Sequence, residues 1–217
     1  MPPTQQLAKP RVSSKSGALR VRVRRSREEL RQATLEAARE IIMHEGPEAL
    51  TARRLAQAVG YTPGTIYNLF ESLPDVLWQV NRDNFARIAE LFADLPGADP
   101  ATRLRALCTR YLDLVEAEPM VFRALFEGPR RSELFPEWYL NAIADLLTRV
   151  ANELRAVAPA MSPEAAKSET TALFAAIQGI AQLRSSGRLE LLTPVSATVL
   201  ADSLVKRVLR DAAAQNG

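Results

Sequence analysis

Residues 62–68 contain several polar side chains with hydrogen-bonding chemistry. Thr65 and Tyr67 carry hydroxyls that suit phosphate oxygens, and Asn68 carries an amide that can pair with a base edge in the major groove of DNA. Gly64 lacks a side chain, although glycine costs a helix about 1 kcal/mol relative to alanine. Its presence indicates that something outside the protein, such as a phosphate backbone, approaches this segment closely.

Two short helices separated by a glycine are predicted to position this polar face. The hydroxyl of Thr51 is expected to cap the first helix, and Gly60 is expected to end it in the left-handed conformation that glycine adopts without steric cost. Thr62 and Pro63 then take the N-cap and first helical position of the second helix. This layout is typical of a helix-turn-helix that reads DNA. The alternative is a small helical hairpin with a solvated polar face.

Positive charge is concentrated in the same part of the chain. Residues 1–70 hold 12 Lys or Arg and 6 Asp or Glu, whereas residues 71–217 hold 16 and 19. The first 25 residues contain seven cations and no acid, which predicts a disordered segment. Arg22, Arg24 and Arg25 are expected to form an arm that follows phosphates or enters the minor groove; the alternative is a solubilising extension.

Residues 26–80 resemble the DNA-binding domain of the TetR family of transcriptional regulators. The run LTARRLAQAVGYTPGTIYNLF carries the resemblance through Leu55, Ala56, Gly60, Gly64, Tyr67 and Phe70. A capping box of Ser26 and Glu29 is expected to start the helix before this run. Leu73 is a departure, because the family usually has a lysine here that opens the fourth helix and holds a phosphate.

The resemblance implies a homodimer that binds a double-stranded DNA operator. The residues expected to contact DNA are Thr51, Arg53, Thr62, Pro63, Gly64, Thr65, Tyr67, Asn68, Arg22, Arg24 and Arg25. Two recognition helices of a dimer would enter successive major grooves of a palindromic site, about 34 to 36 Å apart.

The chain after residue 72 is expected to be entirely helical, because it contains no convincing strand pattern. Helices are predicted at 73–94, 100–117, 119–127, 136–157, 163–186 and 194–213. Prolines mark their starts at Pro100, Pro119, Pro136, Pro163 and Pro194. The expected fold is therefore all-α. It comprises a basic disordered arm at 1–25, a three-helix helix-turn-helix domain at 26–72, and a larger helical effector-binding and dimerisation domain at 73–217.

The helix predicted from Pro163 is apolar nearly all round between Ala172 and Leu183 and is rich in small residues, so both of its sides need cover. Together with the last helix it is expected to form a four-helix interface across a two-fold axis, as TetR-like proteins do. The alternative is a central core helix in a monomer. The residues expected at the dimer interface are Ala172, Ala176, Gly179, Leu183, Val199 and Leu204.

Aromatic residues are dense between residues 78 and 139, where the helices of a TetR-like protein enclose a ligand cavity. The residues expected to bind a small hydrophobic or aromatic effector are Trp78, Asn84, Phe85, Tyr111, Phe122 and Trp138. Asn84 lies on the inward stripe of its helix, where its amide needs a polar partner or a ligand. For each aromatic residue, plain core packing is the alternative.

Catalytic and metal-binding patterns are not found. His44 is the only histidine, and the chain has no glycine-rich phosphate loop and no metal-ligand spacing, so we expect no enzyme, cofactor or metal. The single Cys108 is expected to be a buried small hydrophobe. No apolar run is long enough to cross a membrane and no signal core follows the basic N-terminus, so a cytoplasmic location is expected.

The favoured interpretation is a dimeric transcriptional regulator that acts as a repressor. In the mechanism that the resemblance implies, an apolar effector fills the cavity, shifts the fourth helix and lowers the affinity for the operator. The alternative is an all-helical enzyme or small-molecule-binding protein with an incidental basic N-terminal part.

Overall fold

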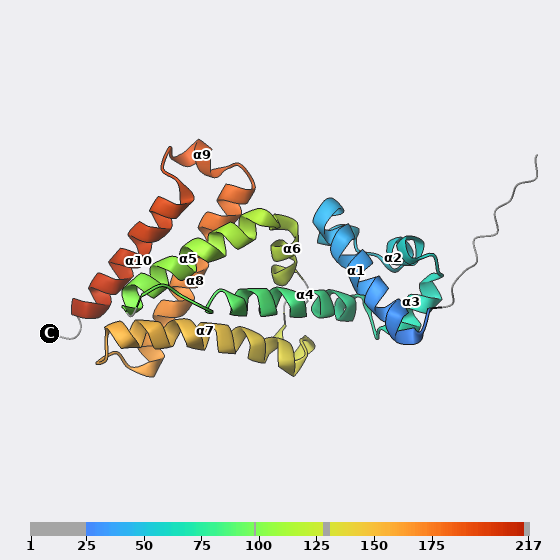
Figure 1. Ribbon diagram of the computed structural model, residues 1–217, viewed down its shortest axis with the longest axis horizontal. Helices are drawn as coiled ribbons and strands as arrows, with labels where there is room; N and C mark the ends of the chain where they lie inside the picture. Colours follow the sequence, from blue (N-terminus) through green and yellow to red (C-terminus); the bar gives the residue numbers. More distant parts are fainter. Residues whose placement is uncertain (1–24, 98, 128–130, 215–217) are drawn as a thin grey trace, which may run out of the picture.

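The computed structural model describes residues 25–97, 99–127 and 131–214. A small group of helices lies at one end of an elongated molecule and a larger helical bundle at the other, with α4 (Leu73–Glu90) running between them (Figure 1). The described residues contain no strand. The predicted fold class, an N-terminal helix-turn-helix domain followed by a larger helical domain, is confirmed.

The small group consists of three helices and a short 3-10 turn, and its local signals act as predicted. Ser26 and Glu29 form a reciprocal capping box, in which each side chain accepts from the other residue's backbone N–H at 3.1 and 2.7 Å. Gly60 ends the second helix with a left-handed φ of 78°. The elements are α1 (Arg27–Glu45), η1 (Pro47–Ala49), α2 (Ala52–Val59) and α3 (Pro63–Leu69).

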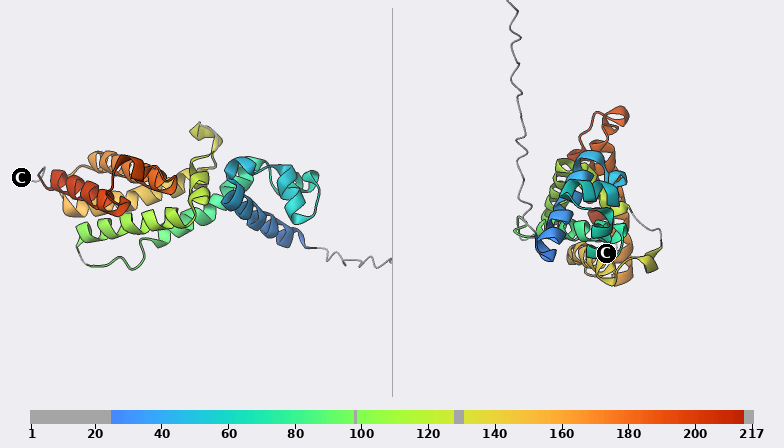
Figure 2. Two further views of the ribbon diagram at one scale, coloured as in Figure 1. Left: turned by 90° about the horizontal axis from the view of Figure 1, so that it is seen from above. Right: turned by 90° about the vertical axis from the view of Figure 1, so that its right-hand side faces the viewer.

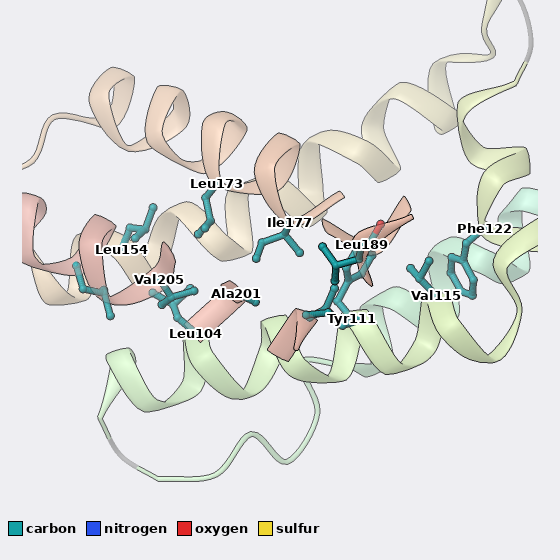
Figure 3. Close-up of a cluster of buried hydrophobic side chains, with 14 residues drawn as sticks. Leu104, Tyr111, Val115, Phe122, Leu154, Leu173, Ile177, Leu189, Ala201 and Val205 are labelled. Carbon is teal, nitrogen blue, oxygen red and sulfur yellow. The ribbon is translucent and has the colours of Figure 1, made fainter. Parts of the chain in front are cut away.

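The bundle is built around α5 and α8, whose apolar faces meet α7 and α10 (Figure 2). Leu173 and Ile177 of α8 point towards Leu104 and Tyr111 of α5 in the largest buried cluster (Figure 3). The elements are α5 (Pro100–Ala117), α6 (Pro119–Arg123), η2 (Ala124–Phe126), η3 (Ser132–Leu134), α7 (Glu137–Val157), α8 (Pro163–Ser185), α9 (Leu189–Leu192) and α10 (Ala197–Ala214).

Three helix predictions after residue 72 need correction. The helix predicted at 73–94 ends at Glu90, and residues 91–94 form turns. The last helix begins at Ala197 and not at Pro194, which lies in the loop before it. The predicted helix at 119–127 is a short α-helix that tightens into the 3-10 turn η2. The one-turn helix α9 was not predicted, because four residues are too few to show a helical period.

Helix α4 takes part in two separate apolar clusters. Val76, Leu77 and Val80 pack with α1, α2 and α3, whereas Ile88 packs against the cluster of the bundle. One continuous helix therefore has one half in the helix-turn-helix group and the other half in the bundle. The predicted domain boundary after residue 72 stays a prediction.

Candidate DNA interface and effector cavity

Helix α3 presents a polar face to solvent. Ile66 is only 1% exposed and anchors the helix in the apolar cluster, whereas Tyr67 on the other side is 55% exposed. Pro63 and Asn68 are exposed beside it, and the half-buried Thr65 hydroxyl lies 3.1 Å from that of Thr62. The residues predicted to contact DNA on α3 therefore share one accessible face. Thr62 occupies the N-cap as predicted, but its hydroxyl meets Thr65 and does not cap a backbone N–H.

The surroundings of Gly64 show that the fold itself does not need a glycine there. A Cβ placed on Gly64 would meet no atom nearer than the Thr62 hydroxyl at 3.9 Å, and the backbone is not in the left-handed region. Because Gly64 has no side chain, the backbone of α3 itself forms the outer surface at this position.

Two arginines of α1 hold the C-terminal end of α3. Arg27 donates to the Asn68 carbonyl at 3.1 Å, and Arg31 donates to the Leu69 carbonyl at 2.8 Å. The Arg31 guanidinium also lies 4.4 Å from the centre of the Phe70 ring. Cations at these last carbonyls satisfy groups that a helix end leaves unpaired. Our reading of the sequence missed this role, because it depends on how α1 crosses α3.

The other residues predicted to contact DNA differ in their surroundings. The Thr51 hydroxyl is used within the fold, where it accepts from the Arg54 backbone N–H at 3.1 Å. Arg53 and Arg25 are exposed. Arg22 and Arg24 lie outside the described residues.

Leu73 is the first residue of α4 and packs against the apolar cluster of the helix-turn-helix group. The helix is capped by Ser72, whose hydroxyl accepts from the Asp75 backbone N–H at 3.2 Å. The departure from the family pattern at this position is therefore an apolar contact at a helix N-terminus.

A cavity of about 200 Å³ lies inside the bundle between α4, α5, α7 and α8. Phe85 and Tyr111, two of the predicted effector contacts, line it. Burial raises the pKa of Cys108, another lining residue, to about 12, so its thiol stays neutral. The lining residues are Phe85, Ile88, Leu91, Phe92, Leu104, Leu107, Cys108, Tyr111, Leu125, Phe126, Ile143, Leu146, Leu147, Val150, Thr170, Leu173, Phe174 and Ile177.

Four predicted effector contacts do not line this cavity. Trp78 lies against Phe135 with ring centroids 5.9 Å apart, and Trp138 lies beneath the Arg82 guanidinium at 4.3 Å. Phe122 is 1% exposed within the bundle's apolar cluster, so it packs as plain core. The density of aromatic residues in the sequence could not distinguish these positions from Phe85, because the side chains that line the cavity are selected by how α7 packs against α4.

Asn84, the fourth of these residues, is fully buried but has polar partners within the protein. It donates to the Asn81 side-chain oxygen at 3.1 Å and accepts from Arg39 of α1 at 3.3 Å. Asn81 in turn donates to the Tyr139 hydroxyl at 3.1 Å, and this hydroxyl donates to the Leu125 carbonyl at 3.1 Å. A network of side chains meets the predicted need for a polar partner, and Asn84 itself does not line the cavity.

An ion-pair cluster joins the same helices. The Glu118 carboxylate, between α5 and α6, accepts from Arg87 at 2.8 Å and also pairs with Arg39. Burial alone would raise the pKa of Glu118, but the hydrogen bond from Arg87 and the charges of both arginines hold that pKa below its usual range. Glu118 is therefore a carboxylate at neutral pH.

Comparison with known families identifies the family of this protein. Residues 35–73 match the profile of bacterial regulatory proteins of the tetR family, and residues 104–208 match a tetracyclin repressor-like C-terminal domain. The chain belongs to the TetR family. It is accordingly a DNA-binding transcriptional regulator.

Solved structures share the TetR fold along nearly the whole chain. A protein of unknown function from Rhodococcus sp. RHA1 matches with a TM-score of 0.69 and 16% identity, over 88% of this chain and 98% of that one. A TetR-family regulator from Bordetella parapertussis 12822 matches with a TM-score of 0.60 and 18% identity, over 84% and 95%. The regulator PfmR from Thermus thermophilus matches with a TM-score of 0.59 and 21% identity, over 82% and 97%. A comparison with curated proteins gives no significant match.

The predicted interface residues of this TetR protein fall into two groups. Ala172, Gly179 and Val199 are exposed on α8 and α10. Ala176, Leu183 and Leu204 are half-buried, and the two leucines pack against the bundle's apolar cluster. On α9, Leu191 and Leu192 are 81% and 69% exposed, a feature that sequence periodicity did not reveal.

Two negative findings apply to the part of the chain that the structure describes. None of its helices is long and apolar enough to span a membrane. Its histidine, cysteine and carboxylate side chains form no group of three that could hold a metal ion.

Proposed function

We propose that this TetR-family regulator is a homodimeric repressor that leaves a palindromic operator when a small apolar effector enters the bundle. The observation that carries the proposal is the course of α4. Its first half packs with the helices that position α3, and Phe85 and Ile88 in its second half line the cavity. A change in the cavity can therefore move the DNA-reading helix through one rigid element.

The exposed face of α3 supports the operator part of the proposal. Tyr67 and Thr65 are placed to reach phosphates and Asn68 to reach a base edge, while the open surface at Gly64 lets the DNA backbone come close to the helix. Cations of the N-terminal arm, Arg22 and Arg24 among them, would add phosphate contacts whose number sets the salt dependence. Such a regulator needs no cofactor and catalyses no reaction, and we place its action in the cytoplasm.

The exposed stripe of α8 supports the dimer. Its exposed positions from 168 to 186 carry no charge, and those at its centre are Ala172, Phe174, Ala175 and Gly179. A Cβ on Gly179 would meet nothing within 4 Å of its own subunit, so the fold leaves room here for a second helix. Val199 on α10 and the two exposed leucines of α9 add apolar surface that a partner subunit would cover.

The experiment that tests the proposal combines footprinting with sedimentation. The full chain should protect a palindromic site upstream of its own gene, and its affinity should fall steeply with salt. Gly179→Arg should give helical monomers that lose this protection, because a charge at a close helix contact cannot be solvated. Ala144→Arg, which adds the same side chain at an exposed small residue of α7, is the matched control. A Gly179→Arg protein that remains dimeric would place the interface elsewhere.

A further inference from the structure

Three residues that line the cavity are exposed to solvent, and they mark where the cavity reaches the surface. Phe126 of η2 is 53% exposed, Ile143 of α7 is 38% exposed and Phe174 of α8 is 37% exposed. The other lining residues in the described part of the chain are buried or half-buried. The mouth of the cavity therefore lies where η2, α7 and α8 meet, and two of its three side chains are phenyl rings.

These two phenyl rings continue inward as a row of three aromatic rings. The ring centres of Phe126 and Phe174 lie 6.4 Å apart at an interplanar angle of 29°, and those of Phe174 and Tyr111 lie 6.2 Å apart at 63°. Tyr111 is only 7% exposed. The row therefore leads from solvent into the bundle.

The rings of this row are spaced more widely than the other aromatic pairs of the described residues. Those pairs have ring centres 4.8 to 5.9 Å apart. Favourable aromatic pairs occur at separations of about 4.5 to 7 Å, so the rings at the mouth interact near the far end of this range. Together with their exposure, the wide spacing shows that the protein itself leaves ring surface uncovered at the mouth.

The exposed ring of Phe174 lies beside the part of α8 that is proposed for the dimer. Ala172 and Gly179 are two helical turns apart and so share one side of the helix. Phe174 follows Ala172 by two residues, and residues with this spacing do not face each other on a helix. Phe174 therefore lies on the flank of the exposed stripe that turns towards the cavity, which it lines.

We propose that Phe126 and Phe174 hold a flat aromatic ring of the effector at the mouth of the cavity, so that the effector is an aromatic compound and not an aliphatic one. This inference rests on the proposed role of the cavity as the effector site. Aromatic rings have a negative face and a positive edge, so the uncovered phenyl rings attract another aromatic ring more strongly than a saturated ring of the same skeleton. The lining contains no charged residue, so the part of the effector that enters the cavity is uncharged.

The test compares acetophenone with cyclohexyl methyl ketone, which share one carbon skeleton and differ only in the saturation of the ring. A cavity of about 200 Å³ suits compounds of this size, since roughly 150 Å³ holds benzene. Binding to the full-length protein is measured by calorimetry and by the shift in melting temperature. The wild-type protein should prefer acetophenone. Phe174→Leu and Phe126→Leu each keep an apolar side chain but remove a ring, and each should reduce the ratio of the two affinities about fivefold, the factor that one aromatic pair supplies.

A third variant at the mouth is the matched control. Ile143→Leu exchanges one aliphatic side chain for another at a lining residue of similar exposure, so it should leave the ratio of the two affinities unchanged. The two phenylalanine variants should sediment as the wild-type protein does, because the rings are assigned to the cavity. Loss of the dimer in either variant would assign its ring to the subunit interface and overturn the inference.

The outcomes distinguish this inference from the proposed function. An affinity ratio that is the same in the wild-type protein and in both phenylalanine variants, with release of operator DNA, would overturn the role of the rings and leave the effector cavity standing. A preference for acetophenone that depends on Phe126 and Phe174, without release of DNA, would support the inference and contradict the repressor mechanism. If neither compound binds, the inference is wrong, and footprinting still tests the operator part of the proposed function separately.

Discussion

The Arg39 guanidinium of α1 is paired with the Glu118 carboxylate at the junction of α5 and α6. Arg87 of α4 donates to the same carboxylate at 2.8 Å. The Glu118 side chain thus connects the helix-turn-helix group, helix α4 and the helical bundle. A movement of the helix-turn-helix group relative to the bundle would have to break or reshape this contact.

Replacing Glu118 with glutamine should lower the free energy of unfolding by about 1 to 3 kcal/mol, because two guanidiniums lose a charged acceptor. Urea denaturation of the full chain measures the change. Asp202→Asn is the control, since it removes an exposed pair with Lys206 on one helix and should cost less than about 0.5 kcal/mol. Equal losses in the two variants would show that the Glu118 cluster contributes no more to the free energy of unfolding than a surface ion pair does.

The contribution of Glu118 should also depend on pH in a defined direction. The folded-state pKa is held below the ordinary value of 4.5, so the stabilisation is present above that value and is lost as the pH falls through the folded pKa. The stability difference between the wild-type protein and Glu118→Gln should therefore be constant from pH 7 to 5 and shrink below pH 4. If the stability difference between the two proteins is undiminished at pH 3, the packing of Glu118, and not its charge, is responsible for the stabilisation.

Tyr67→Phe and Asn68→Ala should weaken DNA binding in different ways. Loss of the Tyr67 hydroxyl should reduce affinity for all sequences by a similar factor, because phosphate contacts carry no sequence information. Loss of the Asn68 amide should relax the preference at one operator position by about 1 to 3 kcal/mol. Titrations against the operator and single-base variants distinguish the two. The same loss of discrimination in both proteins would remove the assigned division of roles.

Gly64→Ala should separate folding from function. Apart from the neighbouring backbone of its own helix, the atom nearest to the new Cβ is the Thr62 hydroxyl at 3.9 Å, so the variant should be as stable as the wild-type protein or more stable by up to about 1 kcal/mol. Its affinity for operator DNA should nevertheless fall, because the methyl group stands between α3 and the phosphate backbone. Thermal unfolding and DNA titration of the same sample provide both numbers. Unchanged DNA affinity would show that the bound backbone does not come close to Gly64.

Leu73→Lys tests the departure from the family pattern at the start of α4. A lysine here should add one phosphate contact, which steepens the dependence of log affinity on log salt by about 0.9. It also removes an apolar side chain from the edge of a cluster, so a modest loss of stability is expected. An unchanged slope would indicate that the DNA backbone does not reach this helix end.

The features that the sequence predicted well are those determined by neighbouring residues. The Ser26 and Glu29 capping box, the left-handed Gly60 and the helix starts at Pro100, Pro119 and Pro163 depend on local backbone geometry. Effector contacts were predicted less well, since the roles of Trp78 and Phe85 differ only through the packing of distant helices. The exposed leucines of α9 were not predicted, because a single helical turn has no periodicity to detect.

A continuous set of side chains leads from the cavity to α1. The Tyr139 ring meets Phe85, a lining residue, edge-on at 4.8 Å, and its hydroxyl donates to the carbonyl of Leu125, another lining residue. The same hydroxyl accepts from Asn81, which accepts from Asn84, which in turn accepts from Arg39. Displacement of Phe85 or Leu125 by an effector would therefore disturb a hydrogen-bond network that ends in the helix-turn-helix domain.

Tyr139→Phe should weaken the coupling between effector and DNA without removing either binding site. The ring that packs on Phe85 is kept, so effector affinity in the absence of DNA should change by less than about twofold. An effector that weakens operator binding 100-fold has a coupling free energy of roughly 2.7 kcal/mol, and loss of the two hydrogen bonds of this hydroxyl, about 1 kcal/mol each, should reduce the effect to about 3-fold. Tyr111→Phe removes a hydroxyl at the cavity but outside this network, so it should alter effector affinity and leave the coupling intact. Operator titrations with and without saturating effector measure the coupling in each protein. If both variants lose it equally, or if Tyr139→Phe keeps it, the signal passes through α4 as a rigid body and the network serves only to hold the helices together.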